Sequence, residues 1–268
     1  MIRIGRRAEC PDVPVPPTPI RVATWNVRHG LDLRTGRVDL AAVAAVIDAL
    51  QVDVVALQEV DREQPRSGGA DQVAALATAL GWHGVFAPTL FGTPGGRWRP
   101  GPGTAVDPGG QAYGIGLLSP HPLRAVTRRA LPGTARGDRW RRSAPWDNEP
   151  RVLLRAEVGA TGVVVSSTHL SYLPWRGLRQ LRVAMGVAAA AAGAAVLMGD
   201  LNLPRRLLRP ALSRAPWHTV HAGPTFPTWR PGLALDHILT RCCRLREVRV
   251  GTGGPSDHLP VVGLLEPG

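Results

Sequence analysis

The chain has 268 residues, of which 44% are hydrophobic and 19% are charged; this balance excludes a disordered polypeptide and supplies enough apolar side chains for a buried core. The net charge of +12 comes entirely from arginine, since the sequence contains no lysine. Arginine codons can be GC-rich and lysine codons cannot, so the charge permits a phosphate-bearing partner without establishing one. We expect a flexible Pro- and Arg-rich lead-in over residues 1–19 and a single folded domain over residues 20–268.

The first half of the chain opens with a strand, a helix and a second strand. Short β-prone runs at Ile20–Asn26 and Val52–Gln58 flank a segment in which Asp39 can cap a helix, and apolar residues recur after it at the helical period. A second helix is expected at Asp71–Leu80. Pro88–Gly110 is dense in glycine and proline and therefore predicts a long irregular loop.

The second half of the chain is richer in strands. Residues 159–162 predict a hairpin turn, and Leu178–Ala192 has a helical pattern. No internal repeat or sharp boundary divides the chain. The strands expected here are Ile115–Leu118, Val152–Val158, Val163–Thr168, Ala195–Met198 and, after a Pro- and Arg-rich stretch, Leu235–Thr240, Leu245–Val250 and Val261–Leu265.

The cysteines and the apolar runs bear on the compartment. Cys10, Cys242 and Cys243 are an odd set without metal-site spacing or a disulfide framework, which favours a reducing compartment. Prolines follow the N-terminal arginines, where a signal peptide would have an apolar core. The run 183–198 is mostly alanine and shorter than the ~20 residues of a membrane-spanning helix. We therefore expect a cytoplasmic protein with no integral membrane segment, and we predict no protein partner.

Clusters of oxygen and imidazole ligands follow nearly every expected strand. Because ligands bind in the crevice beyond strand ends in sheet proteins, we expect these side chains to converge. They include carboxylates, amides and histidines but no cysteine, a set that suits Mg²⁺ or Mn²⁺ better than zinc. The clusters are Thr24-Trp25-Asn26, Leu57-Gln58-Glu59-Val60, Ser167-Thr168-His169-Leu170, Gly199-Asp200-Leu201-Asn202, Leu235-Asp236-His237-Ile238 and Ser256-Asp257-His258-Leu259-Pro260.

This ordered series resembles the endonuclease/exonuclease/phosphatase superfamily of DNase I-like, metal-dependent phosphoesterases. The resemblance extends from about Ile20 to Leu265. Any single tripeptide of the series is a weak signal, but six of them in the family's order are a specific one. The resemblance implies an α/β (α+β) fold, namely a four-layer sandwich of two packed mixed, mostly antiparallel β-sheets flanked by helices, and makes residues 20–268 a catalytic domain.

The resemblance also implies a role for each matching residue. Mg²⁺, with Mn²⁺ as a substitute, would be held by Glu59 as principal ligand together with Asn26 and Asp257. His258 would be the catalytic histidine that Asp236 orients, and Arg28 would contact the substrate phosphate. The remaining catalytic positions would be Asp200 and Asn202, which place the attacking water and the scissile phosphate, and His169, which stabilises phosphoryl charge or assists the leaving group. His258 is favoured as the general base, with Asp200 as the alternative.

Structural explanations compete with several of these roles. Asp200 and Asn202 could form only an Asx-turn, and His258 could be a buried histidine with satisfied hydrogen bonds. The amide of Asn26 could bond backbone alone, and Arg28 could be a solvated charge. A carboxylate at Glu59 would be costly after so apolar a strand unless it had a partner, and alternation places His237 on the face opposite Asp236, where we expect it to be structural.

The segment Arg124–Asn148 combines seven arginines with Trp140 and Trp146. Basic residues interleaved with aromatic ones can bind a nucleic-acid strand or an anionic headgroup. A solvated loop whose arginines reflect codon usage is the simpler interpretation.

Hydrolysis of a phosphoester, specifically a phosphodiester, is the leading functional hypothesis. Its substrate could be nucleic acid, a lipid headgroup or a sugar phosphate, because fold alone does not select one. Arg28 and His169 depart from the pattern of abasic-site repair nucleases and argue against that activity. The alternatives are a DNA or RNA endo- or exonuclease, suggested by the positive charge, and an inactive binding scaffold, which the complete residue set opposes.

Overall fold

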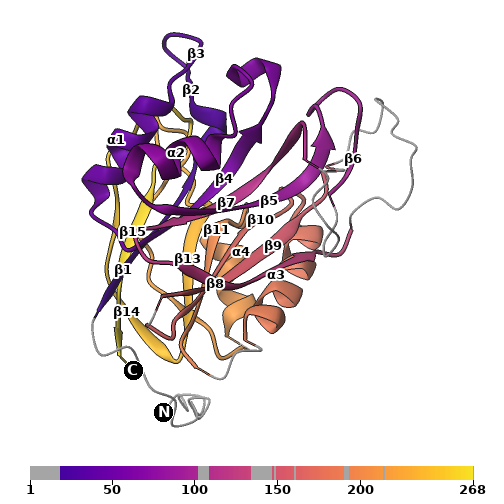
Figure 1. Cartoon of the computed structure of the whole chain (residues 1–268). Helices are drawn as coiled ribbons and strands as arrows, with labels where there is room; N and C mark the ends of the chain where they lie inside the picture. The colour runs from indigo at the N-terminus through magenta and orange to yellow at the C-terminus, as the bar shows by residue number, and fades with distance from the viewer. Residues whose placement is uncertain are drawn as a thin grey trace, which may run out of the picture.

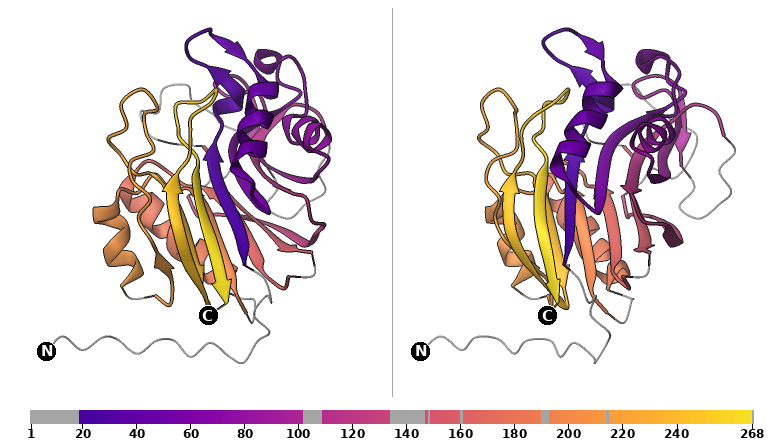
Figure 2. Two further views of the ribbon diagram at one scale, coloured as in Figure 1. Left: turned by 90° about the vertical axis from the view of Figure 1, so that its left-hand side faces the viewer. Right: turned by 60° about the vertical axis from the view of Figure 1, so that its left-hand side comes forward.

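Two β-sheets pack face to face in the computed structural model, with helices on their outer faces (Figures 1 and 2). The structure describes residues 19–101, 109–133, 147, 149–159, 161–189, 193–213 and 215–267. The first sheet has the strand order β14-β15-β1-β4-β7-β5-β6. Its strands are β1 (Ile20–Asn26), β4 (Val54–Arg62), β5 (His83–Gly92), β6 (Trp98–Pro100), β7 (Ala112–Ser119), β14 (Cys243–Val250) and β15 (Val261–Pro267).

The second sheet has the order β12-β13-β11-β10-β9-β8. The pairs β1–β4 and β10–β11 are parallel, and the other described pairs of the two sheets are antiparallel. A small hairpin of β2 (Leu31–Asp32) and β3 (Arg37–Val38) stands apart. The strands of the second sheet are β8 (Leu123–Ala130), β9 (Val152–Val158), β10 (Val164–His169), β11 (Ala195–Asp200), β12 (His218–Thr219) and β13 (Asp236–Arg241).

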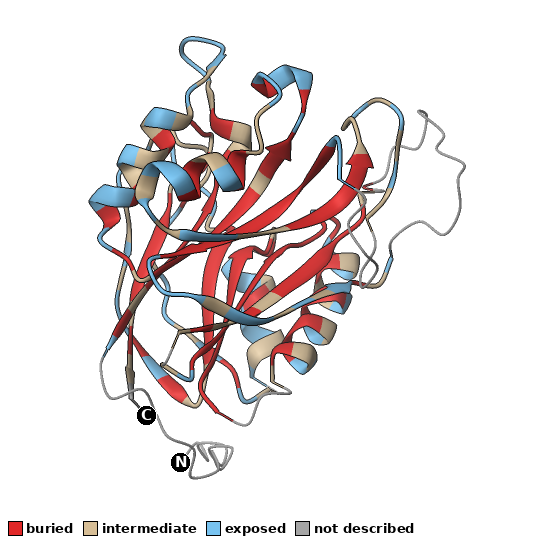
Figure 3. Cartoon of the chain, in the orientation of Figure 1, coloured by how far each residue is buried: buried red, intermediate tan, exposed pale blue. Residues whose placement is uncertain are grey.

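Helices cover both outer faces and complete the expected four layers. Helices α1 (Leu40–Leu50) and α2 (Gln72–Leu80) pack on the first sheet, and α3 (Pro174–Ala188) and α4 (Arg205–Leu212) pack on the second. Three apolar clusters result: one between the sheets and one beneath each helix pair. Buried residues accordingly follow the strands and the inner sides of the helices (Figure 3).

Local sequence explains the elements that were predicted well. Strand β1 is buried on both faces, because Val22 joins the cluster between the sheets and Ala23 joins the one under α1 and α2. Helix α1 begins where the carboxylate of Asp39 accepts a hydrogen bond of 2.9 Å from the backbone N–H of Ala42. Asp71 caps α2 in the same way through Ala74. Antiparallel pairing of β9 with β10 confirms the hairpin.

Three predicted segments need correction. Pro88–Gly110 is not a single irregular loop, since it contains the second half of β5 and all of β6. The Arg-rich segment from Arg124 begins as an edge strand, β8, because its backbone pairs with β9 although few of its side chains are buried. Residues 134–146 and 148, with both tryptophans, lie outside the described part. Helix α3 begins earlier than expected, at Pro174, and ends at Ala188.

Two further observations concern the cysteines and membranes. Cys242 is disulfide-bonded, which the sequence analysis did not anticipate, and Cys243 is a buried free thiol. None of the helices in the described ranges has the length and hydropathy that crossing a membrane requires.

Candidate active site

Strand pairing brings ligand side chains from both sheets to one edge of the sandwich. Asn26 is the last residue of β1 and pairs in register with Gln58 of β4. Glu59 comes next. The sequence predicted that it ends the strand, but β4 continues to Arg62 through a bulge. Glu59 has a φ of 58° at this bulge, and bulges re-aim side chains.

The second sheet contributes three neighbouring side chains in register. His169 of β10 pairs with Asp200 of β11, which pairs with Asp236 of β13. Asp236 begins its strand, contrary to the strand-end pattern, but β13 runs antiparallel to β11. The start of β13 therefore lies at the same edge as the end of β11, and all three side chains are buried there.

The amide of Asn26 joins the two sheets. Its Nδ2 donates to Oε1 of Glu59 at 2.9 Å and to Oδ2 of Asp200 at 3.2 Å. Its Oδ1 accepts from the backbone N–H of Arg28 at 3.1 Å. Asn26 thus bonds side chains from both halves and not backbone alone.

His258 lies in the connection between β14 and β15, against Asp236 and Asp200. Its Nδ1 is 2.9 Å from Oδ2 of Asp236, and its Nε2 is 3.7 Å from Oδ2 of Asp200. The indole N–H of Trp25 donates to the backbone carbonyl of His258 at 2.9 Å, and the backbone N–H of His258 donates to the hydroxyl of Ser256 at 3.1 Å. The imidazole is therefore held between two carboxylates by a fixed backbone.

Asp200 has both a structural and a site-forming contact. Its Oδ1 accepts from the backbone N–H of Asn202 at 2.9 Å, the Asx-turn anticipated as a structural explanation. Its Oδ2 faces Asn26 and the two histidines. The turn positions Asn202, whose Nδ2 lies 3.1 Å from Nε2 of His169.

Burial and neighbouring charge set the protonation of the cluster. Burial lowers the pKa of His258, but the carboxylates of Asp236 and Asp200 outweigh it and raise that pKa to about 10. Burial, followed by the charge of Asp236, raises the pKa of Asp200 to about 7. Burial and the charges of Arg151 and His258 lower the pKa of His169 well below its ordinary value. Without a cation, a proton is therefore held at His258 while His169 is neutral.

Arg28 and Asp257 form an ion pair at the mouth of the site. The guanidinium Nη1 of Arg28 lies 2.5 Å from Oδ2 of Asp257, with both side chains partly exposed. The sequence predicted that Arg28 contacts the substrate phosphate and that Asp257 binds the metal, whereas in the structure the two side chains bind each other. Any anion that binds Arg28 competes for this contact.

All nine sequence-predicted site residues are joined in one network of hydrogen bonds and ion pairs. His237 lies outside it, as expected, with Nε2 3.0 Å from the carbonyl of Leu203. The nine residues are Asn26, Arg28, Glu59, His169, Asp200, Asn202, Asp236, Asp257 and His258.

Sequence reasoning missed several residues around this network. The hydroxyl of Thr225 donates to Oδ2 of Asp236 at 2.5 Å from the stretch read only as Pro- and Arg-rich. Glu149 is close to Glu59 electrostatically, and burial raises its pKa to about 7 although Arg151 opposes the shift. Arg151 is buried between Asp147 and Glu149. Glu149 and Arg151 are charged residues two positions apart just before β9, and this spacing was the signal in the sequence that could have identified them.

Two groups of ligands could hold a cation. Among the described residues, one atom each of Asp200, Asp236 and His258 lies within 4.8 Å of the others. In this first group, Asp236 and His258 are already hydrogen-bonded to each other, and a cation would have to break that bond to use both atoms. Glu59 offers a less committed oxygen: its Oε1 accepts from Asn26, and in the described structure its Oε2 makes no hydrogen bond. Partly exposed carboxylate oxygen of this kind fits Mg²⁺ or Mn²⁺.

Comparison with known proteins gives a consistent answer. The family model described as Endonuclease/Exonuclease/phosphatase family matches residues 23–258, which include all nine network residues. The chain belongs to this family. Family members are phosphoesterases, so the chain has the fold of a family of hydrolases. No match was found among curated proteins.

Solved structures show the same fold. An endonuclease/exonuclease/phosphatase from Beutenbergia cavernae DSM 12333 has 28% identity and a TM-score of 0.72, over 93% of this chain and 72% of that one. D. rerio TDP2 complexed with single-strand DNA product has 18% identity and a TM-score of 0.63, over 93% and 99%. The human Nocturnin catalytic domain with bound sulfate has 20% identity and a TM-score of 0.60, over 92% and 94%.

Proposed function

We propose that this chain is a Mg²⁺-dependent phosphodiesterase that hydrolyses its substrate by in-line attack of an activated water. The observation that carries the proposal is the amide of Asn26, which bonds Glu59 of one sheet and Asp200 of the other. This contact brings a carboxylate suited to a cation beside a carboxylate-histidine cluster suited to moving a proton. Phosphoester hydrolysis needs both functions at one place.

Glu59, with Asn26 and Asp257, would hold the cation. Mg²⁺ keeps several waters and takes one or two protein carboxylates, so a single partly exposed glutamate with weaker neighbours is an adequate set. The cation would neutralise charge on the phosphoryl oxygens and on the leaving oxygen. To bind it, Asp257 must loosen its ion pair with Arg28, which frees the guanidinium for a substrate phosphate.

His258 and Asp200 are the groups that handle the water's proton. Asp236 accepts from Nδ1 of His258 and leaves Nε2 facing the site. A bound cation disfavours protonation nearby, so it would lower the pKa of His258 from about 10 toward the range in which a base works. Asp200, whose pKa is about 7, shares this proton and is the alternative base.

His169 and Asn202 would bind the phosphoryl oxygens. Neutral His169 has its Nε2 against Nδ2 of Asn202, so in this state it can donate only through Nδ1. Both N–H groups of Asn202 are already engaged, with Nε2 of His169 and with the carbonyl of Leu170 at 3.0 Å, so Asn202 must release one of them to bind a phosphoryl oxygen, and charge stabilisation depends more on Arg28 than the sequence suggested.

A nuclease is the second candidate. A protein of the same fold, D. rerio TDP2, has been solved with a single-strand DNA product, and the net charge of +12 would attract nucleic acid. Nucleic acid, lipid headgroups and sugar phosphates all offer the required phosphoester.

The test is hydrolysis of bis(p-nitrophenyl) phosphate and of p-nitrophenyl phosphate by the full chain, first stripped with EDTA and then resupplied with Mg²⁺ or Mn²⁺. We expect diester hydrolysis that depends on the added cation and that, at limiting Mg²⁺, is strongly reduced in Glu59→Gln but kept in Glu266→Gln. Undiminished hydrolysis in EDTA would refute the mechanism. Monoester hydrolysis alone would refute the diester assignment, and a parallel plasmid and single-strand DNA assay decides the nuclease question.

A further inference from the structure

The two helix layers differ sharply in charge. Helices α3 and α4 together contain six arginines and no acidic residue, whereas α1 and α2 contain no arginine and one acid, Asp48. Both layers are encoded by the same gene with the same codon usage, so codon composition does not explain the difference. The arginines are Arg176, Arg179, Arg182, Arg205, Arg206 and Arg209.

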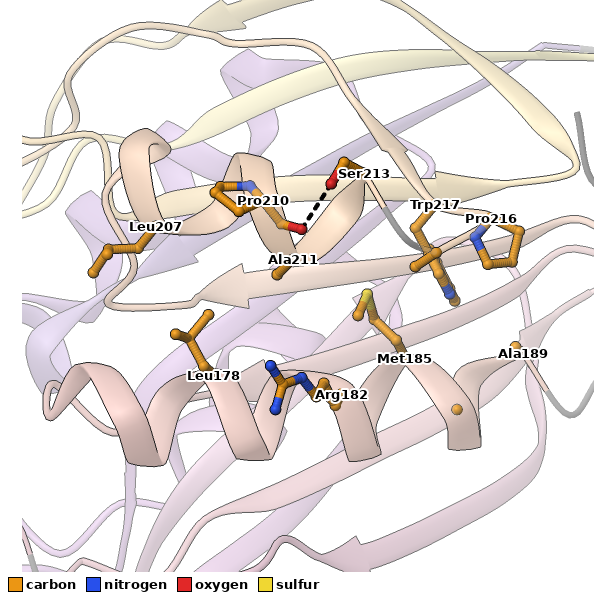
Figure 4. Close-up of a pocket in the computed structure, with 12 residues that line it drawn as sticks. Leu178, Arg182, Met185, Ala189, Leu207, Pro210, Ala211, Ser213, Pro216 and Trp217 are labelled. Carbon is orange, nitrogen blue, oxygen red and sulfur yellow. Dashed lines mark hydrogen bonds between the residues drawn. The ribbon is translucent and has the colours of Figure 1, made fainter. Parts of the chain in front are cut away.

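An apolar groove of about 660 Å³ lies between α3 and α4. Leu178 and Met185 of α3 face Leu207 and Ala211 of α4 across it, and Trp217 closes one end (Figure 4). Trp217 is only 2% exposed, so it supports the groove wall and offers no free ring face. The groove has the size of a ligand site for an apolar group.

Exposed arginines and aromatic side chains surround this groove. Arg179 is exposed on α3, Arg182 of the same helix is exposed and lines the groove, and Arg205, Arg206 and Arg209 are exposed on α4. At the start of α3, Tyr172 is 54% and Trp175 is 62% exposed. Apolar surface bordered by arginine and exposed tryptophan is the pattern of a helix layer that lies on a membrane surface.

We propose that the α3–α4 face binds the surface of a bilayer that contains anionic phospholipid, with the arginines on the phosphates and the groove and Trp175 against the acyl region. Charge complementarity selects this occupant, because a second copy of the same face would bring like charges together. Single-stranded nucleic acid would also be attracted by the positive charge, and Tyr172 and Trp175 offer rings at the start of α3. The groove itself, however, is lined mainly by Leu, Met, Ala and Pro, and its one ring, that of Trp217, is buried, so it offers no surface on which bases stack.

The two helices that flank the groove begin a few residues after candidate site residues. Helix α3 starts at Pro174, shortly after His169, and α4 starts at Arg205, shortly after Asn202. A bilayer on this face would lie next to the edge at which the catalytic network opens. The proposal does not depend on the proposed function, since surface binding requires no hydrolysis.

The test is co-flotation of the full chain with phosphatidylcholine vesicles that either contain or lack phosphatidylserine. We expect binding only to the anionic vesicles. The triple variant Arg179→Gln/Arg182→Gln/Arg209→Gln should bind on the order of 100-fold more weakly, since each basic side chain near such a surface contributes roughly fivefold. The matched control Arg124→Gln/Arg129→Gln/Arg244→Gln removes the same charge from exposed strand positions and should keep most of the affinity.

Leu207→Ser tests the groove without changing charge and should weaken binding roughly tenfold. If thermal melting shows that Leu207→Ser misfolds, Ala211→Gln is used instead. Failure of the wild type to bind anionic vesicles would overturn the proposal, as would equal losses of vesicle binding in the triple variant and its control. A folded groove variant that binds vesicles as well as the wild type would also overturn it. So would a triple variant that loses binding to single-strand DNA but keeps its binding to vesicles. Hydrolysis of bis(p-nitrophenyl) phosphate, measured in parallel, keeps this result separate from the proposed function.

Discussion

The two halves of the sandwich contribute to the site in different ways. The half built on β1 and β4 supplies Asn26 and Glu59, and Glu59 is partly exposed at a strand bulge. The half built on β10, β11 and β13 supplies buried His169, Asp200 and Asp236 in adjacent register positions. The first half leaves the carboxylate of Glu59 accessible to a cation, while the buried carboxylates of the second half hold a proton on His258.

The two halves have the same layered architecture but different proposed chemical roles, cation binding in one and proton transfer in the other. The buried half is organised before any ligand arrives, because Asp236 already bonds the imidazole of His258 and Asp200 already bonds the backbone N–H of Asn202. The open half is left to be completed by a cation and substrate. Variants in the two halves should therefore fail in distinguishable ways.

The largest effect is expected for His258→Asn. This imidazole comes from the β14–β15 connection and is hydrogen-bonded to Asp236 of the buried half. Loss of the imidazole should lower kcat about 10³-fold, within the range of proton-transfer catalysis, and excess Mg²⁺ should not restore it. Steady-state kinetics on bis(p-nitrophenyl) phosphate measures this, with the exposed His121→Asn as the matched control. Restoration by Mg²⁺ would show that His258 acts on the cation and not on the proton.

Asp236→Asn should lower kcat roughly 10²-fold, because the neutral amide orients His258 without supporting its charge. The charge of Asp236 is the largest influence that raises the pKa of His258, so the acidic limb of the pH–rate profile should shift to lower pH. Asp48→Asn on α1 is the control. An equal loss of rate with an unchanged pH profile would assign Asp236 a purely structural role.

Glu59→Gln tests the open half. Its half-saturating Mg²⁺ concentration should rise at least about tenfold, since even residues behind metal ligands cost 10–100-fold in affinity, and high Mg²⁺ should recover part of the rate. Activity titrated against Mg²⁺ provides the measurement. If the Mg²⁺ dependence is unchanged, the cation lies elsewhere and the contrast between the halves is wrong.

The smallest effect is on stability in the absence of metal. The pKa of His258 is raised from 6.5 to about 10 on folding, so its contribution is complete below pH 6.5 and is lost as pH rises toward 10. With EDTA present, Tm should fall by a few degrees between about pH 6.5 and 7.5, below the range in which an ordinary cysteine titrates. In His258→Asn this slope should flatten; an equally steep slope in the variant would contradict the assignment.

The sequence predicted those parts of the fold that have strong local signals. Asp39 and Asp71 marked the helix starts, and β1 and β9 have the expected bounds. Strand β8 was missed because an exposed edge strand has no apolar alternation, and β5 because Pro88 interrupts it. Short α4 was hidden among arginines and prolines.

The site was predictable as a set of residues but not as a geometry. The six ligand clusters in family order contain eight of the nine network residues, and Arg28 was identified by its position two residues after Asn26. The bulge at Glu59 could not be predicted, since it depends on the register of β4 against β7. Nor could the pairing of Arg28 with Asp257, or the support of Asp236 by Thr225, because both join residues brought together only by the fold.

The location of a bound cation tests the central claim most directly. Crystals of the full chain soaked in Mn²⁺ would show the ion by its anomalous signal. The account predicts one ion about 2.1 Å from an oxygen of Glu59, with the hydrogen bond between Asp236 and His258 intact. An ion held instead by Asp200, Asp236 and His258, with that hydrogen bond broken, would contradict it.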